Sequence, residues 1–216
     1  MQVLFVHGMG RSALSGWPML FRLRKAGLHT ASFAYSVSLQ SFDHIEKRLT
    51  QHIIAVAAQG DYVLIGHSLG GVLIRSALRA LPTETRNPKH IFLLGSPIQA
   101  ALLAQKFQAI PMFRLLFRWV TRDCGNLLGS SQRMSAICIP NLPITAIVGI
   151  KGFSGQWSPF GLEANDGVVS LAEVSSVLIS DQIKLPVVHS LLPANKQVTE
   201  IILQRIKGNH YISDIA

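Results

Sequence analysis

Cysteine is scarce in this sequence, which has two in 216 residues, Cys124 and Cys138. Two cysteines cannot build the disulfide framework of a small secreted domain, and their spacing does not match that of a metal site. We therefore expect two unpaired thiols, with one bridge between them as the alternative, and no bound metal. A chain of this length can instead bury a continuous hydrophobic core.

Charge is also sparse, because Asp, Glu, Lys and Arg together make up 14% of the residues while 49% are hydrophobic. This balance excludes an intrinsically disordered chain and suits a sheet that is buried on both faces. Acidic residues are fewer than basic ones, so the net charge is +9. This excess permits an anionic partner, but the basic residues are scattered without a dense tract, and we expect no nucleic-acid binding.

The sequence has no uninterrupted hydrophobic run of membrane-spanning length. The best candidate, 134–150, contains two prolines and an asparagine. The opening residues, MQVLFVHGMG, have no basic segment before their apolar residues and no small-residue cleavage site. We therefore expect a chain without a membrane span or a signal peptide, located in the cytoplasm.

Short β-branched runs alternate with longer amphipathic stretches along the chain. We expect strands at 2–6, 30–35, 62–66, 90–95, 144–150 and 183–188, and helices at 13–27, 42–56, 69–81 and 198–206. Repeated strand, helix, strand units require crossover connections, which give a parallel sheet with helices on both faces. We therefore predict an α/β fold in which residues 1–216 form one domain around a mostly parallel sheet of about six strands.

Ser68 lies in the sequence Gly-His-Ser-Leu-Gly (66–70), between an expected strand and an expected helix. At such a junction this pattern makes a sharp turn that exposes the serine hydroxyl at the edge of the sheet. The turn also leaves Ser68 at a helix N-terminus, where free N–H groups favour developing negative charge. We predict that Ser68 is a nucleophile for acyl transfer and that His67 is a packing residue rather than its base.

The chain resembles the α/β-hydrolase family, in particular the small bacterial lipases and esterases. The resemblance rests on LFVHGMG (4–10), GHSLGG (66–71), NDGVVS (165–170) and HSLL (189–192). The histidine and glycines at 7–10 resemble the oxyanion loop of lipases. The resemblance implies that the backbone N–H groups of Met9 and Leu69 form the oxyanion hole, where backbone donors need no reorganisation.

An activated serine needs a base and an orienting carboxylate, which in this family follow the nucleophile in the order acid, then histidine. His189 matches the family's catalytic histidine, because it lies between an apolar run and the closing helix. Asp166 matches the family's triad aspartate, and Asp181 is the alternative acid. His90, at the start of an expected strand, and His210, in the polar tail, are poorer candidates for the base.

Together these residues predict a serine esterase or lipase-like hydrolase that acts through an acyl-enzyme on Ser68 and needs no cofactor. The expected substrate is a small-molecule acyl ester or a lipid. The same triad would serve a thioesterase or an acyltransferase. A hydrolase-fold protein that binds a lipid or another protein without catalysis is the alternative from a different class.

Residues 98–143 interrupt the strand and helix alternation with a helical, hydrophobic pattern that we predict to be an insertion at the rim of the sheet. The segment 112–122 places Phe113, Leu116 and Phe117 on one helical face, with arginines spaced four residues apart on another. We expect a lid or wall for the acyl pocket, or peripheral contact with an anionic membrane. The alternative is a helix packed permanently on the core.

Overall fold

The computed structural model describes residues 1–110, 120–121 and 123–213, with side chains described up to residue 208. Six strands form one sheet in the order β2-β1-β3-β4-β5-β6, and all neighbouring strands run parallel. The strands are β1 (Gln2–Val6), β2 (His29–Phe33), β3 (Tyr62–His67), β4 (His90–Leu94), β5 (Ile144–Gly149) and β6 (Asp181–Leu185). The predicted α/β fold class is confirmed.

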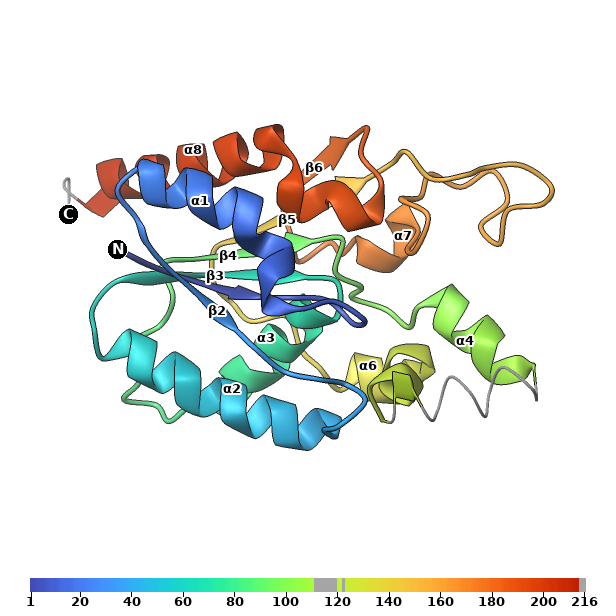
Figure 1. The fold of residues 1–216 in the computed structure, drawn as a ribbon, viewed down its shortest axis with the longest axis horizontal. Coiled ribbons are helices and arrows are strands. Elements are labelled where there is room, and N and C mark those ends of the chain that lie inside the picture. Colours follow the sequence, from blue (N-terminus) through green and yellow to red (C-terminus); the bar gives the residue numbers. More distant parts are fainter. Residues whose placement is uncertain (111–119, 122, 214–216) are drawn as a thin grey trace.

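Helices cover both faces of this sheet (Figure 1). One face carries α1 (Trp17–Lys25) and α8 (Lys196–Ser213), and the other carries α2 (Phe42–Ala57) and α3 (Leu69–Arg79). Each pair of helices packs on the sheet through its own hydrophobic core. Because the central strands β3 and β4 are buried on both faces, their sequences are almost continuously apolar.

Several element boundaries differ from those expected. The helix expected at 13–27 is divided into a short 3-10 helix, η1 (Ala13–Gly16), and α1, which begins at Trp17-Pro18, where a proline is favoured. The strand expected at 183–188 occupies 181–185, since Pro186 lacks the N–H donor that a longer ladder would use. These shifts leave the order of the elements as expected.

The insertion at 98–143 is helical and contains no strand among its described residues. It includes α4 (Leu102–Ala109), helical residues 123–129 and α6 (Ser131–Ser135), all beyond the carboxyl edge of the sheet (Figure 1). Several of its side chains belong to the same hydrophobic core as α2 and α3, namely Ala104, Cys124, Leu127, Leu128 and Met134. The predicted lid residues Phe113, Leu116 and Phe117 lie outside the described residues.

Two expectations about composition can be compared with the structure. Both cysteines are free thiols, with Cys124 buried and Cys138 exposed. Within the described ranges, no helix combines the length and the hydrophobicity that crossing a bilayer requires.

Glycines allow α3 to begin directly against the strands. A Cβ atom at Gly70 would overlap the backbone carbonyl of Val6, and one at Gly66 would overlap the backbone of Gly71. No side chain fits either position without moving backbone, so the turn between β3 and α3 depends on glycine at both. This close approach fixes the position of Ser68, which lies between Gly66 and Gly70.

Replacing Gly70 with alanine should destabilise the fold, because the added methyl group must displace β1 or α3. We expect Gly70→Ala to lower the free energy of unfolding by at least about 2 kcal/mol in urea denaturation. Gly208→Ala in α8 is the matched control, since a Cβ there meets no atom within 4 Å. That control should raise stability by up to about 1 kcal/mol. Equal effects of the two changes would contradict the packing described for the turn.

Candidate active site

Ser68 occupies a strained turn at the carboxyl end of β3. Its backbone has φ 54° and ψ −124°, and it is the one residue other than glycine with a positive φ in the described part of the chain. Such a conformation costs on the order of 1–3 kcal/mol and persists only where surrounding contacts impose it. One of these contacts is the Ser68 N–H, which donates to the Leu94 carbonyl at 2.9 Å. The half-exposed side chain of Ser68 thus projects at the carboxyl edge of the sheet.

His189 and Asp166 form a buried pair. His189 Nδ1 lies 2.6 Å from Asp166 Oδ2, and the two residues are 7% and 1% exposed. The other carboxylate oxygen, Oδ1, accepts the backbone N–H groups of Val168 at 3.0 Å and Val169 at 2.9 Å. The His189 N–H donates to the Asp166 carbonyl at 2.9 Å, so backbone as well as side chain fixes the pair. With Nδ1–H directed at the carboxylate, the Nε2 lone pair is available to a proton donor.

Gly95 connects this pair to Ser68. It follows β4 with φ +53°, and a Cβ atom there would lie 3.0 Å from both His189 Nδ1 and Asp166 Oδ2. It also directly follows Leu94, whose carbonyl accepts the Ser68 N–H. The ring of His67, the residue before Ser68, lies tilted against that of His189, with ring centroids 4.7 Å apart. These contacts place the His189–Asp166 pair beside the turn that carries Ser68.

His67 packs behind the pair. Its Nε2 lies 3.1 Å from the His189 carbonyl, and its Nδ1 has no hydrogen-bond partner among the described residues. Burial lowers the pKa of His67 well below 6.5, and the nearby His189 lowers it further. A neutral His67 therefore supports the backbone of His189 without adding charge beside it.

The loop after β1 lies against Ser68. A Cβ atom at Gly8 would be 3.0 Å from Ser68 Cβ, so the loop backbone can approach this closely only through a glycine. The ring of His7 stacks on Tyr35 with centroids 4.1 Å apart, and the Tyr35 hydroxyl donates to the His7 carbonyl at 2.6 Å. The N–H groups of Met9 and Leu69 donate no hydrogen bond within the described residues. Two backbone donors beside the serine are thus left for a ligand.

The profile of the alpha/beta hydrolase family matches residues 3–151, more than half of the chain. The chain belongs to the alpha/beta hydrolase family. No curated protein sequence matches this hydrolase. Solved structures with a similar fold include a lipase, a thioesterase and a lipase-esterase related protein.

Three of these solved structures cover most of the hydrolase. The mature lipase BlEst2 of Bacillus licheniformis has 16% identity and a TM-score of 0.73, covering 94% of this chain and 91% of its own. The thioesterase RedJ of Streptomyces coelicolor has 14% identity and a TM-score of 0.63, with 94% and 88% covered. A lipase-esterase related protein of Clostridium acetobutylicum has 18% identity and a TM-score of 0.55, with 94% and 93% covered. At these identities the likeness shows a shared fold.

Glu173, which we did not predict as a structural residue from the sequence, links the segment after β5 that carries Asp166 to the insertion at 98–143. It is the N3 residue of a capping box on Ser170 at the start of α7 (Leu171–Val174), and its carboxylate accepts the backbone N–H groups of Ser170 and Leu102. Burial raises the pKa of this carboxyl. The Ser-x-x-Glu sequence at 170–173 is the signal that could have identified the cap. Its second partner, at the start of α4, depends on tertiary structure alone.

The rival acid and base lie at the opposite end of the sheet. Asp181 begins β6, where it accepts hydrogen bonds from Arg205 at 2.7 and 2.9 Å and from the Thr145 hydroxyl at 2.6 Å. His90 begins β4, with Nε2 2.8 Å from the same hydroxyl. The structure therefore brings Asp166 and not Asp181 to His189. The side chain of His210 is not among those that the structure describes.

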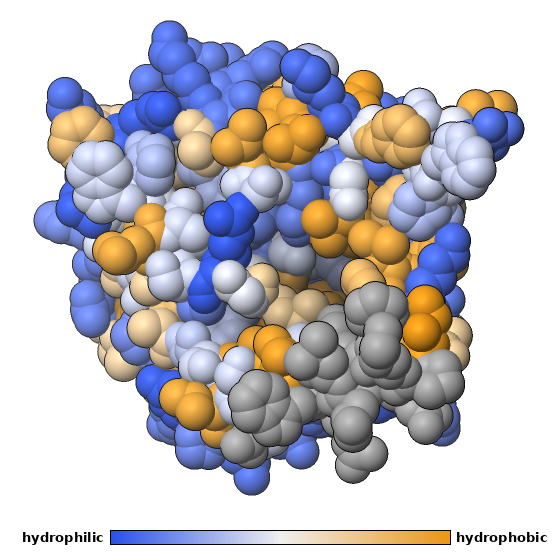
Figure 2. Space-filling model, turned by 45° about the vertical axis from the view of Figure 1, so that its right-hand side comes forward, coloured by the Kyte–Doolittle hydropathy of each residue, from blue (hydrophilic) through white to orange (hydrophobic). Residues whose placement is uncertain are grey.

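Apolar side chains gather around the carboxyl edge. Figure 2 looks toward this part of the hydrolase and shows apolar surface beside a hollow. A hollow of about 390 Å³ is lined by residues of the loop after β1, including Gly8, Gly10 and Arg11, and by residues 34–38. In the described part of the chain, no three His, Cys, Asp or Glu side chains are arranged to hold a metal ion.

Removing His90 should change how stability depends on pH. Burial lowers the pKa of His90 from 6.5 to about 4, so between these values the unfolded chain binds a proton that the folded chain does not. The free energy of unfolding therefore falls as the pH falls through this range. In urea titrations at pH 6 and pH 5, His90→Gln should lose about 1 kcal/mol less stability than the parent chain.

The same two titrations on His29→Gln, which replaces an exposed histidine on β2, control for the substitution itself. A His90→Gln variant with the parent pH dependence would show that folding does not lower the pKa of His90.

Proposed function

We propose that this hydrolase cleaves carboxylic esters through an acyl-enzyme on Ser68, with His189 as the base and Asp166 as the orienting acid. The observation that carries the proposal is the strained Ser68 turn beside a buried His189–Asp166 pair, whose Nδ1 to Oδ2 distance is 2.6 Å. A strained serine at a strand-to-helix turn lowers the stability of the fold, and its hydroxyl is presented for nucleophilic attack. Residues 1–216 would act as one domain, because both helix layers pack on the same sheet.

In the acylation step, His189 Nε2 takes the proton of the Ser68 hydroxyl while Ser68 Oγ bonds to the substrate's carbonyl carbon. The Asp166 carboxylate accepts the His189 Nδ1–H and stabilises the imidazolium that forms. The protonated His189 then gives its proton to the leaving oxygen, and the carbonyl carbon–oxygen bond breaks. The products of this step are an alcohol and an ester of Ser68.

The negative charge on the carbonyl oxygen would be held by the backbone N–H groups of Met9 and Leu69. This assignment is supported by the contact of Gly8 with Ser68 and by the absence of other acceptors for both N–H groups among the described residues. Because the stacking of His7 on Tyr35 holds the loop, the donors are oriented before the charge develops. Water activated by His189 would then hydrolyse the acyl-enzyme.

A thioester is the second substrate class that this machinery would accept. A thiolate leaves more readily than an alkoxide and needs the same nucleophile, base and oxyanion donors. The thioesterase among the similar structures favours testing such substrates. An acyltransferase would use the same acyl-enzyme but transfer the acyl group to an alcohol or an amine instead of water.

Replacing Ser68 or Asp166 should abolish or cripple ester hydrolysis. We expect Ser68→Ala to lower kcat by about 10⁶-fold, because the nucleophile is lost. Asp166→Asn should lower kcat by about 10³–10⁴-fold, because the amide no longer selects the productive imidazole tautomer. Steady-state hydrolysis of 4-nitrophenyl butyrate measures both. Asp181→Asn is the matched control and should stay within about twofold of the parent. Hydrolysis of the ester by folded Ser68→Ala at the parent rate would contradict the proposal.

We also propose peripheral contact with an anionic lipid surface through the loop after β5. Phe153, Trp157 and Leu162 are 64%, 82% and 89% exposed on this loop, which the Gly155 N–H closes onto the Gly161 carbonyl at 2.8 Å. Exposed aromatic and aliphatic side chains on one loop suit insertion into a bilayer interface. The net charge of +9 would favour anionic lipid.

Shortening the loop's apolar side chains should weaken this contact. In cosedimentation with phosphatidylglycerol vesicles, Trp157→Ala/Leu162→Ala should lower the partition coefficient at least about tenfold, since two large side chains no longer enter the interface. Val177→Ala removes an apolar side chain that is 99% exposed between α7 and β6 and should bind as the parent does. Equal binding by all three proteins, or none by the parent, would count against the lipid contact.

A further inference from the structure

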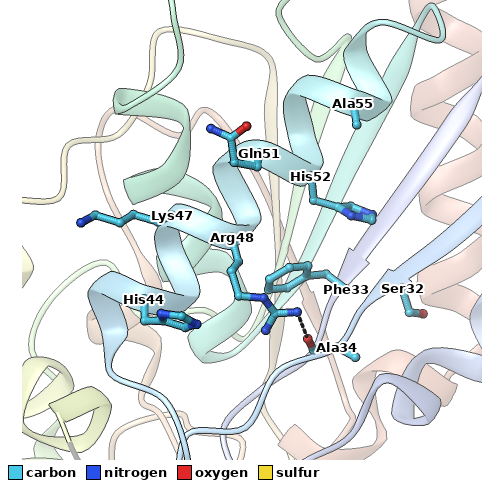
Figure 3. Close-up of a pocket in the computed structure, with 9 residues that line it drawn as sticks. All are labelled: Ser32, Phe33, Ala34, His44, Lys47, Arg48, Gln51, His52 and Ala55. Carbon is cyan, nitrogen blue, oxygen red and sulfur yellow. Dashed lines mark hydrogen bonds between the residues drawn. The ribbon is translucent and has the colours of Figure 1, made fainter.

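A second hollow lies along the free edge of the sheet. Its volume is about 660 Å³, and it runs between the edge strand β2 and the outer side of α2. Figure 3 shows the residues that line it: Ser32, Phe33, Ala34, His44, Lys47, Arg48, Gln51, His52 and Ala55. In the view of Figure 3, Arg48 lies over Phe33 with His44 and His52 on either side of it. We call this hollow the edge groove.

The edge groove is basic, and none of its lining residues is acidic. The two acidic residues of α2 act elsewhere, since Glu46 accepts a hydrogen bond from Ser76 on α3 and the charge of Asp43 acts on Arg133. Neither Lys47 nor Arg48 forms an ion pair within the described residues. A solvated helix face commonly intersperses both signs of charge, whereas this one carries only positive charge. The groove therefore favours an anion.

Arg48 is already oriented at the strand edge. Its guanidinium lies 5.3 Å from the centre of the Phe33 ring and donates to the Ala34 carbonyl at 3.4 Å. These contacts involve one N–H and one face of the guanidinium, which leaves further donors for a ligand. A planar guanidinium with several remaining donors is well suited to phosphate.

The edge groove adjoins the hollow whose lining includes Gly8, the glycine that lies against Ser68. Ala34 lines both this groove and the hollow that contains Gly8, Gly10 and Arg11. Ser68 follows β3, which is separated from β2 by β1 alone. Two interstrand spacings amount to about 10 Å, a distance that an extended substituent of roughly eight bonds can span. A group bonded to the carbonyl at Ser68 could thus reach the groove while still attached.

Resting on the proposed function, we infer that the edge groove binds a phosphate group on the leaving portion of the substrate. The substrate would be an acyl ester or thioester of an extended alcohol or thiol that carries a phosphate. On acylation the bond from the carbonyl carbon to this oxygen or sulfur breaks, and the leaving atom takes its proton from His189. The acyl chain remains on Ser68, and the phosphorylated alcohol or thiol departs through the groove.

Two sources supply such leaving groups, namely phospholipid headgroups and soluble phosphorylated thiols, and the experiment separates them. Hydrolysis is compared for three substrates with the same acyl chain: a lysophosphatidylglycerol, an acyl-coenzyme A and the neutral 4-nitrophenyl ester. We expect at least one phosphate-bearing substrate to have a KM that rises with ionic strength, while that of the neutral ester does not. The substrate that shows this behaviour identifies the source.

The variant Lys47→Gln/Arg48→Gln removes both charges and keeps the side chains long. It should lower the ratio of kcat/KM for that substrate to kcat/KM for the neutral ester about tenfold. Arg48→Lys keeps the positive charge, so its ratio should lie between those of the double variant and the parent. Lys207→Gln on α8 is the matched control, because this exposed lysine lies on the other face of the sheet. A salt-independent KM for both phosphate-bearing substrates, or an equal loss in the control, would overturn the inference.

Failure of the proposed function gives a different result, because then none of the three substrates is hydrolysed. In that case calorimetric titration with coenzyme A and with glycerol 1-phosphate tests the groove directly. Binding of either compound that the double variant weakens about tenfold would support an anion site in the groove. No binding by the parent hydrolase, or equal binding by parent and variant, would rule it out.

Discussion

The backbone conformation of Ser68 is the constraint on which the rest of the site depends. Ser68 is held at φ 54°, a conformation that favours glycine. Its N–H donates to the Leu94 carbonyl, and Gly66 and Gly70 allow α3 to begin directly against the strands. This strain is offset by packing across the whole sheet, whose central strands are buried on both faces. A rigid core therefore holds one hydroxyl outward at an edge where substrate can reach it.

The parallel sheet explains why residues distant in sequence meet at this edge. His7 follows β1, Ser68 follows β3, Gly95 follows β4, Asp166 lies in the segment after β5, and His189 follows β6. Because all six strands run in the same direction, their carboxyl ends form one rim, and each connection contributes one part of the site. The same topology puts β2 at the margin, where the absence of a further strand leaves room for the edge groove beside α2.

Much of the fold could be predicted from the alternation of apolar runs, and Ser68 from its glycines and its place between a strand and a helix. The preference for Asp166 over Asp181 rested on the resemblance of residues 165–170 to the family, because both acids lie in polar segments before His189 and no pattern in the chain separates them. Asp181 proved to begin β6, at the far end of the sheet, where Arg205 and Thr145 bind it. The roles of Tyr35 and Gly95, and the contact of Glu173 with Leu102, depend on segments that are distant in sequence, so they leave no pattern along the chain.

An activated Ser68 differs from a merely exposed one in its reactivity toward a fluorophosphonate, which labels only an activated serine. Labelling followed by mass spectrometry of the proteolysed hydrolase measures this reactivity. We expect one adduct, located on Ser68, whose rate of formation falls at least about 10³-fold in His189→Gln. No adduct on Ser68, or an adduct that forms at the same rate without the imidazole, would contradict the activation of Ser68.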